Sequence, residues 1–459
     1  MGILKELFYL HTMSTISILW LLALKPANSL PRGASRKRDL QGQRVSAQRG
    51  GAAGRAGVKN GVMREPIAFP PPDLPKALSD HAATSWRGLI YLSGGCDSPN
   101  GNEFLPDLGI FACTSLSDSF FSFDPSKYFD HFVDLPNLPR SRYRHTSTAV
   151  NNKIWIVGGR DLNDNLLDTV DVYDIDTNSW TSLPLPLSYQ VSDQAAFARD
   201  GFIYVSGGYD QVYNEKSAVY RIDTGMSTST LVIEDVAPMI VARGDISVAQ
   251  DSQYAYVAGG FQSPFCEALA TVERYDFESG VWELLSDLVD SRADFGMVAL
   301  GGVLLAFGGE GLVEGACDGP VTSPENIITA KDSVEVLGPD GFVDVGLKLD
   351  SHRFRFASVA WENTKSVYTF GGQQPYDAAC QCYATSKSIY GYTKLYEAAR
   401  NVISTPNPTV SPTQAPTTSP PVPAPTDDPG FVLTTGNDLC ENAAELKVLA
   451  AGLGRFELA

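Results

Sequence analysis

Residues 145–184 decide the fold of this chain, and they read HTSTAVNNKIWIVGGRDLNDNLLDTVDVYDIDTNSWTSLP. Three short runs, TSTAV, KIWIVGG and TVDVYDI, are followed by SWTSL, and each is bounded by Asn, Asp, Gly or Pro. Runs of this length, rich in β-branched and aromatic residues, are typical of antiparallel strands joined by tight turns. The adjacent Gly158 and Gly159 indicate a sharp bend and a close approach by an aromatic side chain, which Tyr173 and Trp180 could supply. The stretch therefore predicts a four-stranded antiparallel sheet.

The second of these runs recurs along the chain. Strands such as YLSGG, IYVSGG and AYVAGG end in a glycine pair whose second member is Gly95, Gly159, Gly208, Gly260, Gly309 or Gly372. The pairs are 64, 49, 52, 49 and 63 residues apart, and Tyr275 and Trp282 repeat the spacing of Tyr173 and Trp180. A four-stranded unit repeated about every 50 residues resembles the kelch repeat, whose blades assemble into a β-propeller. The resemblance covers roughly residues 66–396 and implies an all-β fold, a six-bladed kelch-type β-propeller with four antiparallel strands per blade.

The number of strands determines how the ring closes. The sixth blade supplies three runs, FASVAW, SVYTFGG and SIYGYTKLY, before a proline-rich segment that cannot join a ladder, because proline lacks the donor N–H. Residues 66–70 stand before the first blade in the layout of a fourth strand. We therefore expect them to complete the last blade as its outer strand, paired with Ser388–Thr393, so that no open edge is left.

The chain divides into a signal peptide at 1–29, a basic disordered segment at 30–64, the propeller at 65–396, a Ser/Thr/Pro-rich stalk at 397–429 and a poorly ordered tail at 430–459. The apolar run ISILWLLAL and the small-x-small site Ala27–Ser29 predict the signal peptide, with an uncleaved signal anchor as the alternative. The basic segment is a plain leader, a protease site at Arg36–Arg38 or part of an organelle transit sequence. The stalk composition is typical of an extended, O-glycosylated connection.

Charge and hydropathy limit the partners. Residues 1–64 carry 11 Lys or Arg and 2 acids, and since the whole chain carries −18, the remainder carries −27. An acidic propeller argues against nucleic acid and against anionic membranes. The mature chain contains no stable membrane span. We expect a secreted or cell-surface protein, with an endomembrane, organelle-targeted or signal-anchored protein as the alternative, and leave its oligomeric state open.

Six of the seven cysteines follow the glycine pairs, in loops on one face: Cys96, Cys113, Cys266, Cys317, Cys380 and Cys382. Loop cysteines in a chain with a secretory signal predict disulfides. We expect Cys266 to pair with Cys317, and Cys96 to pair with Cys113 unless either reaches the C-x-C pair of the sixth blade. Zinc is the alternative, but C-x-C is not a usual ligand spacing and no His pair accompanies it, so neither a metal nor a cofactor is expected.

Arginine recurs in the loops that lead into the innermost strands, at positions 140, 142, 144, 243, 292, 353 and 355. The first residue of each innermost strand, counted back from its glycine pair, is His81, His145, Gln194, Asp245, Asp294 or Phe356. In the kelch family this face holds the ligand, so the resemblance implies an axial pocket whose candidates are Arg142, Arg144, His145, Arg243, Asp245, Arg292, Asp294, Arg353 and His81. Convergent guanidinium groups would bind a carboxylate or an acidic peptide. The alternative is structural, because the family's R-x-x-H motif at 142–145 often bonds to backbone.

These observations predict a non-enzymatic binding module that recognises a protein or a glycan on the loop face. The alternative is a carbohydrate-active enzyme on the same scaffold. Galactose-oxidase-like enzymes, which share this propeller, need two His and two Tyr with one Tyr joined to Cys; His81, His145 and Tyr143 lie on adjacent blades, but no second Tyr or Cys can be named. A sugar epimerase that uses the arginines is the other enzymatic possibility. The loop Asp161–Asn165 lacks the Gly and the distal Glu of a calcium loop, which predicts a solvated turn.

Overall fold

The computed structural model of the chain describes residues 71–98, 102–105, 110–127, 131–225, 230–263, 267–312, 328–393 and 395–404. All of them belong to one compact unit, which begins at Val58. The predicted signal peptide, the basic segment, the expected strand at 66–70, Cys266, Cys317 and the tail lie outside the described residues.

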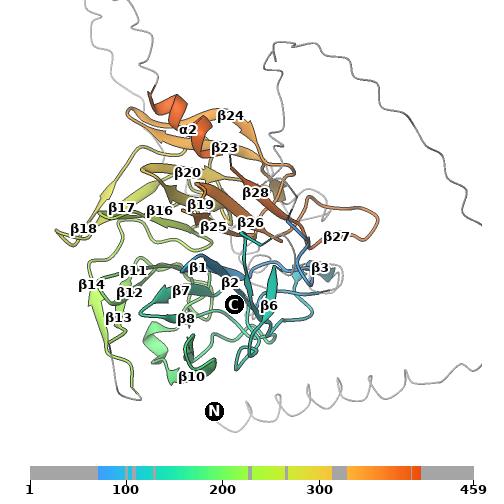
Figure 1. Ribbon diagram of the computed structural model, residues 1–459, viewed down its shortest axis with the longest axis vertical. Coiled ribbons are helices and arrows are strands. Elements are labelled where there is room, and N and C mark those ends of the chain that lie inside the picture. The colour runs from blue at the N-terminus through green and yellow to red at the C-terminus, as the bar shows by residue number, and fades with distance from the viewer. Residues whose placement is uncertain are drawn as a thin grey trace, which may run out of the picture. The chain divides into compact units, whose positions relative to one another are not determined.

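Six antiparallel sheets form the blades of a propeller (Figure 1). Blade 1 consists of β1 (Ala82–Trp86), β2 (Leu89–Ser93), β5 (Phe120–Phe123) and β6 (Phe132–Asp134). Blade 2 consists of β7 (Thr146–Val150), β8 (Lys153–Val157), β9 (Thr169–Asp174) and β10 (Ser179–Pro184), and blade 3 of β11 (Ala195–Arg199), β12 (Phe202–Ser206), β13 (Val219–Asp223) and β14 (Ile233–Val236). Blade 4 consists of β15 (Ser247–Gln250), β16 (Tyr254–Ala258), β17 (Val272–Asp276) and β18 (Val281–Leu284), and blade 5 of β19 (Gly296–Leu300), β20 (Val303–Phe307), β23 (Ser333–Gly338) and β24 (Gly341–Lys348). Blade 6 has three strands among the described residues, β25 (Ala357–Trp361), β26 (Ser366–Phe370) and β28 (Ile389–Tyr392).

The first strand of each blade lies nearest the axis. Strands β1, β7, β11, β15, β19 and β25 contact one another in that order, and β25 in turn contacts β1. Figure 1 shows β1, β7, β11, β19 and β25 toward the middle, with β10, β14, β18 and β24 at the periphery. The ring is therefore complete within the described residues, and the prediction of an all-β propeller with six blades is confirmed.

The four runs of residues 145–184 form the four strands of blade 2, as predicted. Tyr173 and Trp180 are directly opposite each other in the β9–β10 ladder. Both rings also pack on Phe120 of blade 1, with centroids 4.9 Å apart in each case. Their role is to join two blades.

The glycine pairs are required for a different reason from the one expected. Gly158 and Gly159 have φ of 71° and 90°, a region that glycine adopts without steric penalty. A Cβ on Gly158 would lie 2.5 Å from the Val191 carbonyl oxygen, and one on Gly159 would lie 2.6 Å from that of Tyr143. In blade 2 the close approach therefore comes from these backbone carbonyls and from the Gln194 side chain, and the expectation that Tyr173 and Trp180 supply it was wrong.

That backbone belongs to the segments that lead into the innermost strands, which we call the leading loops. In each blade the N–H of the second glycine donates to a carbonyl of the next blade's leading loop, at 2.8–3.0 Å. The acceptors of Gly95, Gly159, Gly208, Gly260, Gly309 and Gly372 are Arg142, Val191, Arg243, Arg292, Arg353 and Leu78. The last of these bonds joins blade 6 to blade 1 in the same way as the other five junctions.

The segment before blade 1 also lies along blade 6. The N–H of Leu74 donates to the Lys387 carbonyl at 2.7 Å, and that of Leu78 to the Ser386 carbonyl at 3.3 Å. Both leucines are buried in a core cluster that is built mainly from blades 1 and 6. Helix α2 (Leu395–Ser404) follows β28, and its Leu395 packs into the core cluster of blades 5 and 6. The helix spans the boundary that the sequence suggested between propeller and stalk.

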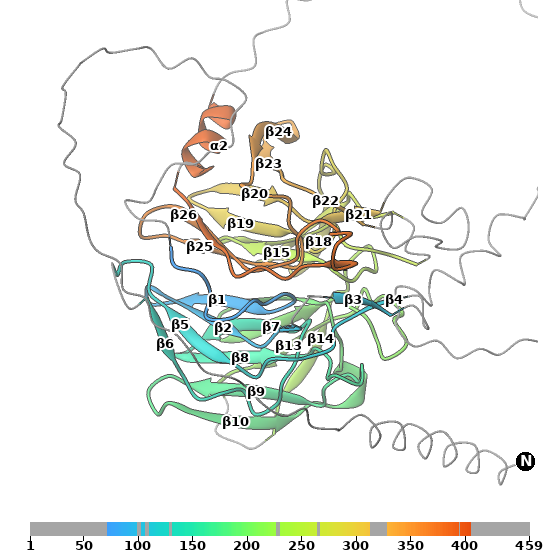
Figure 2. The same ribbon diagram turned by 90° about the vertical axis from the view of Figure 1, so that its right-hand side faces the viewer.

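The long inserts of three blades carry short strands on one side of the ring (Figure 2). Strands β3 (Asn102–Leu105) and β4 (Ile110–Ala112) of blade 1 form one sheet with β27 (Cys382–Tyr383) of blade 6. Strands β21 (Glu310–Leu312) and β22 (Ile328–Ala330) form a hairpin in blade 5. The short η1 (Leu187–Tyr189) lies between blades 2 and 3. None of the helices in the described ranges is long and apolar enough to cross a membrane.

Two disulfides occur among the described residues of these inserts. Cys96 pairs with Cys113, with Cα atoms 5.9 Å apart, which is one of the predicted alternatives. Cys380 pairs with Cys382, with Cα atoms 5.2 Å apart. We did not expect the second pairing, because we treated the C-x-C pair as a partner for blade 1.

Candidate functional site

One residue from each leading loop faces the propeller axis, and these six residues are called the axial ring. They are Asp80, Arg144, Asp193, Asp245, Asp294 and Arg355, all with φ between 48° and 58°. The N–H of each donates to the carbonyl of the ring residue in the preceding blade, at 2.9–3.0 Å, and Asp80 closes the circle by donating to Arg355. A positive φ is unfavourable for residues other than glycine, and six of them persist because this closed circle of hydrogen bonds holds each one in place.

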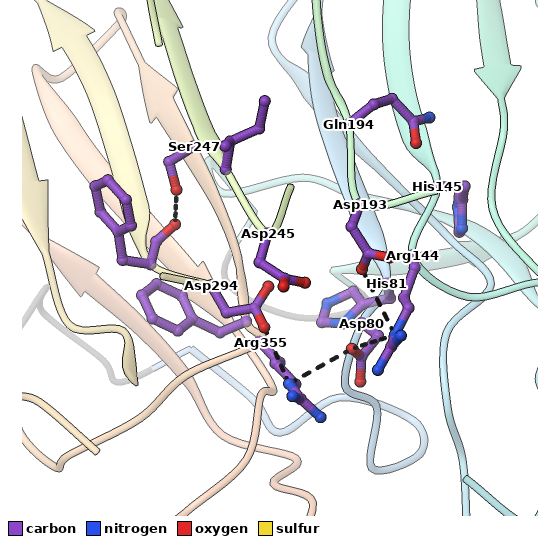
Figure 3. A pocket seen from close by; sticks show the side chains of 13 residues that line it. Asp80, His81, Arg144, His145, Asp193, Gln194, Asp245, Ser247, Asp294 and Arg355 are labelled. Carbon is purple, nitrogen blue, oxygen red and sulfur yellow. Dashed lines mark hydrogen bonds and ion pairs between the residues drawn. The ribbon is translucent and has the colours of Figure 1, made fainter. Parts of the chain in front are cut away.

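The next residue of each loop forms a second layer: His81, His145, Gln194, Ile246, Phe295 and Phe356. Both layers line a pocket of about 140 Å³, together with Ser247 (Figure 3). The sequence prediction mixed the two layers. It placed Asp245 and Asp294 in one set with His81 and His145, and it missed Asp80 and Asp193 altogether. The signal that could have separated them is the distance to the second glycine, which is 15 residues for the first five members of the axial ring.

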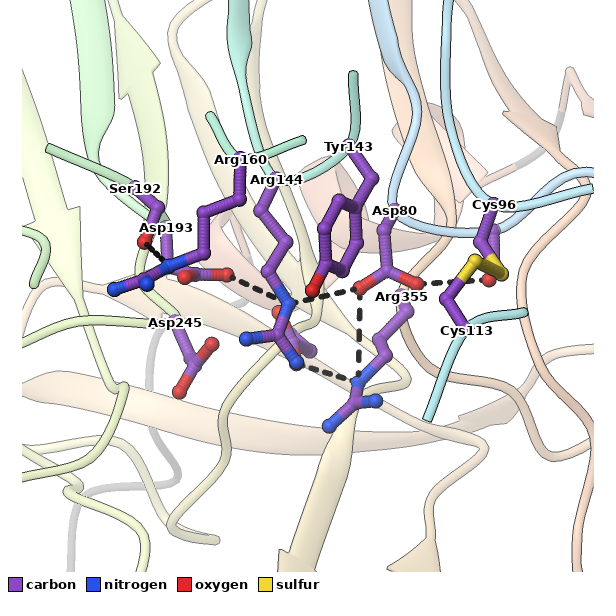
Figure 4. A network of polar contacts seen from close by, with 12 residues as sticks. Asp80, Cys96, Cys113, Tyr143, Arg144, Arg160, Ser192, Asp193, Asp245 and Arg355 are labelled. Atoms are coloured by element: carbon purple, nitrogen blue, oxygen red, sulfur yellow. Dashed lines mark hydrogen bonds and ion pairs between the residues drawn. A yellow bond between two sulfur atoms is a disulfide. The ribbon is translucent and has the colours of Figure 1, made fainter. Parts of the chain in front are cut away.

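The two arginines of the axial ring lie between carboxylates (Figure 4). The Nε of Arg144 lies 3.8 Å from Asp80 and 3.5 Å from Asp193. The Nε of Arg355 lies 3.9 Å from Asp80 and 3.0 Å from Asp294, and its Nη2 lies 3.3 Å from Glu310 of β21. Burial disfavours both charges, but the surrounding carboxylates outweigh it and raise the pKa of both arginines. Both guanidinium groups are therefore held in ion pairs, although the Nε of Arg144 has no hydrogen-bond partner among the described residues.

The opposite side of the axial ring is acidic. Asp193, Asp245 and Asp294 are consecutive around the ring, and Figure 3 shows their carboxylates pointing into the same space. Burial, reinforced by Asp294 and Asp193, raises the pKa of Asp245 well above its ordinary value. Burial also raises the pKa of Asp294 to about 8, although Arg355 opposes the change. A pocket with four aspartates and two paired arginines does not fit the expected anion site.

The two histidines of the second layer are buried and neutral. Burial lowers the pKa of His81 to about 3 and that of His145 well below its ordinary value. The His145 Nε2 lies 2.9 Å from Ser93 Oγ, whereas neither ring nitrogen of His81 has a hydrogen-bond partner among the described residues. Tyr143, considered above as a copper ligand, donates instead to Asp164 at 3.2 Å. Within the described ranges, no three His, Cys, Asp or Glu side chains are grouped so that they could hold a metal ion.

Four of the predicted pocket arginines do not line the pocket. Arg142, Arg243 and Arg292 have exposed fractions of 0 % and Arg353 one of 1 %, and each donates to the carbonyl of the first glycine of its own blade's pair. Arg142 also pairs with the buried Asp171. Burial lowers the pKa of Arg142, and Asp171 opposes this shift. The prediction that these arginines ring the pocket was wrong, and the structural alternative describes them.

The charges of these inter-strand sites are matched blade by blade. Arg243 pairs with Glu273 at 2.8 Å, and Arg292 pairs with Glu335. Where a leading loop has an apolar residue in place of the arginine, an aromatic residue stands in place of the acid, as Val191 and Tyr220 show in the same core cluster. Leu78 and Phe121 repeat this substitution in blade 1, and Arg353 stacks over the Tyr390 ring at 4.6 Å in blade 6. Each site is therefore an ion pair, a cation–aromatic pair or an apolar pair, as the cost of burying an unpaired charge requires.

Two short loops follow the glycine pairs of blades 2 and 3, and Tyr213 of the second loop connects them to the pocket by accepting from Arg144 at 3.3 Å and donating to Asp164 at 2.8 Å. In Asp161–Asn165 the first carboxylate accepts two backbone N–H groups and the Asn165 amide, at 2.8–3.2 Å, and Asp210–Asn214 repeats this pattern at 2.9–3.1 Å. The segment Asp161–Asn165 is thus a hydrogen-bonded turn. The loops also join each other, since Gln211 bonds to the backbone of Asp164 and Leu166. Each loop exposes one apolar side chain, Leu162 at 54 % and Val212 at 68 %.

Comparison with known proteins identifies the scaffold. Residues 80–309, half of the chain, match the family described as the KLHDC2/KLHL20/DRC7 Kelch-repeats domain. The chain belongs to the kelch-repeat family. Kelch-like protein 40 of Xenopus tropicalis is 28% identical over 187 residues, which are 39% of this chain and 29% of that protein. Alpha-scruin of Limulus polyphemus is 24% identical over 246 residues, which are 51% of this chain and 25% of that protein.

The kelch chain thus matches about a third or less of the length of these curated relatives. Among solved structures, the one titled "Structure of YjhT" superimposes with a TM-score of 0.56 and 16% identity, covering 69% of this chain and 95% of that chain. This likeness supports the kelch fold alone.

Proposed function

We propose that this kelch propeller is a non-enzymatic binding module that recognises a protein partner on the face carrying the axial pocket. The observation that carries the proposal is the pair of joined loops with exposed apolar tips, Leu162 and Val212, beside that pocket. Interfaces gain most from apolar side chains on surfaces that are already rigid, because little conformational entropy is lost on binding. The names of the kelch relatives, which are those of kelch-like proteins, favour the same role.

The test is a binding screen with the full chain and three variants. Leu162→Ser and Val212→Ser should each weaken a partner by about tenfold, since each removes an apolar contact from the interface. Val281→Ser is the control, because Val281 is 57 % exposed but begins β18, at the opposite end of the sheets from the pocket. Partners that bind all three variants as tightly as the parent chain would exclude this face.

Secretion or display at the cell surface is part of the proposal. The apolar run before Ala27–Ser29 supports it, as do two disulfides in surface inserts. N-terminal sequencing of the mature protein tests it, with Leu30 as the expected first residue. An intact Met1 recovered from cytosol would contradict it.

The alternatives to protein recognition are a glycan ligand and a carbohydrate-active enzyme. Within the part of the chain that the structure describes, an enzyme is supported by the group of His81, His145 and the arginines near one axis. A glycan array and a copper assay on the purified chain separate them from protein recognition. Stoichiometric copper or turnover of a sugar would replace the binding proposal.

We also propose that residues 66–70 complete blade 6 as its outer strand. The hydrogen bonds of Leu74 and Leu78 to the backbone that leads into β28 support this arrangement, because they bring the N-terminal segment to that blade.

A further inference from the structure

The charges of the axial ring are unevenly neutralised. Arg144 pairs with Asp80 and Asp193, and Arg355 pairs with Asp80 and Asp294. Asp80 thus lies between two arginines. Asp245, on the other side, lies between two aspartates, and the contact that its carboxylate makes is a 2.8 Å hydrogen bond from the Tyr209 hydroxyl. We call Asp193, Asp245 and Asp294 the acidic arc.

A second observation shows that the acidic arc is suited to a ligand. The Asp193 side chain is only 4 % exposed, and its Oδ2 has no hydrogen-bond partner among the described residues. The ring of the buried His81 also faces the pocket, and both of its nitrogens lack a hydrogen-bond partner among the described residues. Buried polar atoms are nearly always paired, so unsatisfied atoms that converge on one cavity indicate the position of a ligand. Figure 3 shows Asp193, Asp245 and His81 directed toward the centre.

The charges around the axial pocket determine which sign of charge a ligand should carry. The Nε of Arg144 also lacks a hydrogen-bond partner among the described residues, but it lies between Asp80 and Asp193. An anion there would have to displace a carboxylate from Arg144, or from Arg355. A cation would instead meet three carboxylates with too few positive partners, and would relieve their mutual repulsion. The raised pKa values of Asp245 and Asp294 agree with this reading.

We propose that the acidic arc receives a positively charged side chain, a lysine ammonium or an arginine guanidinium, from the protein partner that the loop face binds. The proposal rests on the proposed function. A cavity of about 140 Å³ accommodates one long side chain and not a folded element. Ile246, Phe295 and Phe356 line the same pocket, so the aliphatic stem of lysine or arginine would lie against apolar groups while its charged end reaches the carboxylates.

The experiment is a screen of phage-displayed random peptides against the full chain. Selected peptides should share a Lys or Arg, and Asp245→Asn should bind them at least about tenfold more weakly, because it removes a buried charge partner. The matched control is Asp200→Asn, which makes the same change at the same kind of backbone position, with φ of 51°, on a side chain that is 80 % exposed. This control should bind like the parent chain.

A second measurement uses n-butylammonium and n-butylguanidinium at millimolar concentration, with n-butyrate as the anionic control. The two cations should raise the melting temperature of the parent chain and of Asp200→Asn, but not that of Asp245→Asn. Stabilisation by butyrate, selected peptides that share Asp or Glu, or equal binding to Asp245→Asn would overturn the proposal. If Leu162→Ser abolishes partner binding while the cations have no effect, the cation site fails and the proposed function stands. If the cations bind through Asp245 but the loop-face variants change nothing, only the proposed function fails.

Discussion

Two arginines that lie two residues apart on one leading loop have opposite surroundings. Arg142 is fully buried beside Asp171, whereas Arg144 faces the axial pocket. Arg353 and Arg355 repeat this difference on the loop into blade 6. The backbone is the cause, since only the second arginine of each pair has a positive φ, 58° and 53°. The same residue type therefore stabilises a blade or defines the pocket, according to its place relative to the glycine pair.

Removing most of the leading loop of blade 1 should have the largest effect. A chain that starts at Ser79 lacks Leu74 and Leu78, which are 2 % and 1 % exposed, and the carbonyl that accepts the Gly372 N–H. Burial of two leucines contributes about 4–10 kcal/mol, comparable with the total stability of a domain. We expect this chain to aggregate, and a chain that starts at Met63 to match the mature protein in soluble yield and urea unfolding.

A third chain, starting at Pro71, isolates the expected outer strand, because it keeps both leucines but lacks residues 66–70. It should be less stable than the Met63 chain. Equal stability of the Pro71 and Met63 chains would remove the outer strand from the fold, and a stable Ser79 chain would contradict the closure of the ring at Leu78.

Truncating each of the two arginines of one loop should lower the stability of the protein by different amounts. Arg142→Ala leaves Asp171 buried without its cation, so we expect a loss of about 3–5 kcal/mol in the free energy of unfolding. Arg144→Ala should cost about 1–2 kcal/mol, because its partners Asp80 and Asp193 line the axial pocket, where water can take the place of the guanidinium group. Urea unfolding of both variants measures the difference. Equal losses would mean that the two positions are not distinct.

Removing the charge of Glu273 should recover part of the stability that is lost when Arg243 is replaced. Arg243→Met alone leaves Glu273 buried and unpaired, although Glu273 still accepts the backbone N–H groups of Ile240 and Val241. The double variant Arg243→Met, Glu273→Gln removes the charge and keeps an acceptor. We expect it to be more stable than Arg243→Met by about 1–3 kcal/mol. Additive losses in the double-mutant cycle would show that charge matching is not what holds these sites.

The last prediction concerns pH. The pKa of Asp294 is raised from its ordinary value of 3.8 to about 8, so its contribution to stability is complete below about pH 4 and is lost as the pH rises through 8. Asp294→Asn cannot ionise and should flatten the decline of stability between about pH 4 and pH 8, by at most about 1.4 kcal/mol per pH unit. Asp200→Asn should leave the decline unchanged, and parallel profiles for the parent chain and Asp294→Asn would contradict the raised pKa. The charged groups around Asp294 in the folded chain are Arg355, Glu310, Asp80, Asp193 and Asp245.

The fold was readable from the sequence because each blade carries its own signal. Alternating strands, turn residues and the glycine pair are local features, and residues 145–184 gave all four strands of blade 2. The site was harder to predict. Whether an arginine of the R-x-R motif turns toward Asp171 or toward the axis depends on a single backbone dihedral, which composition does not reveal. Helix α2 and the Cys380–Cys382 pairing were also missed, since neither is part of the repeat.

The closed circle of hydrogen bonds in the axial ring has a consequence for specificity. Each of its six N–H groups and six carbonyls is bonded to a neighbouring blade, so the backbone at this level has little capacity left to read a ligand. Recognition falls to side chains, one from each blade, held at nearly the same φ. The scaffold therefore offers six equivalent positions whose side chains can be changed without disturbing the blades, since Asp and Arg already occupy such positions. In this chain the six positions, from blade 1 to blade 6, carry Asp, Arg, Asp, Asp, Asp and Arg.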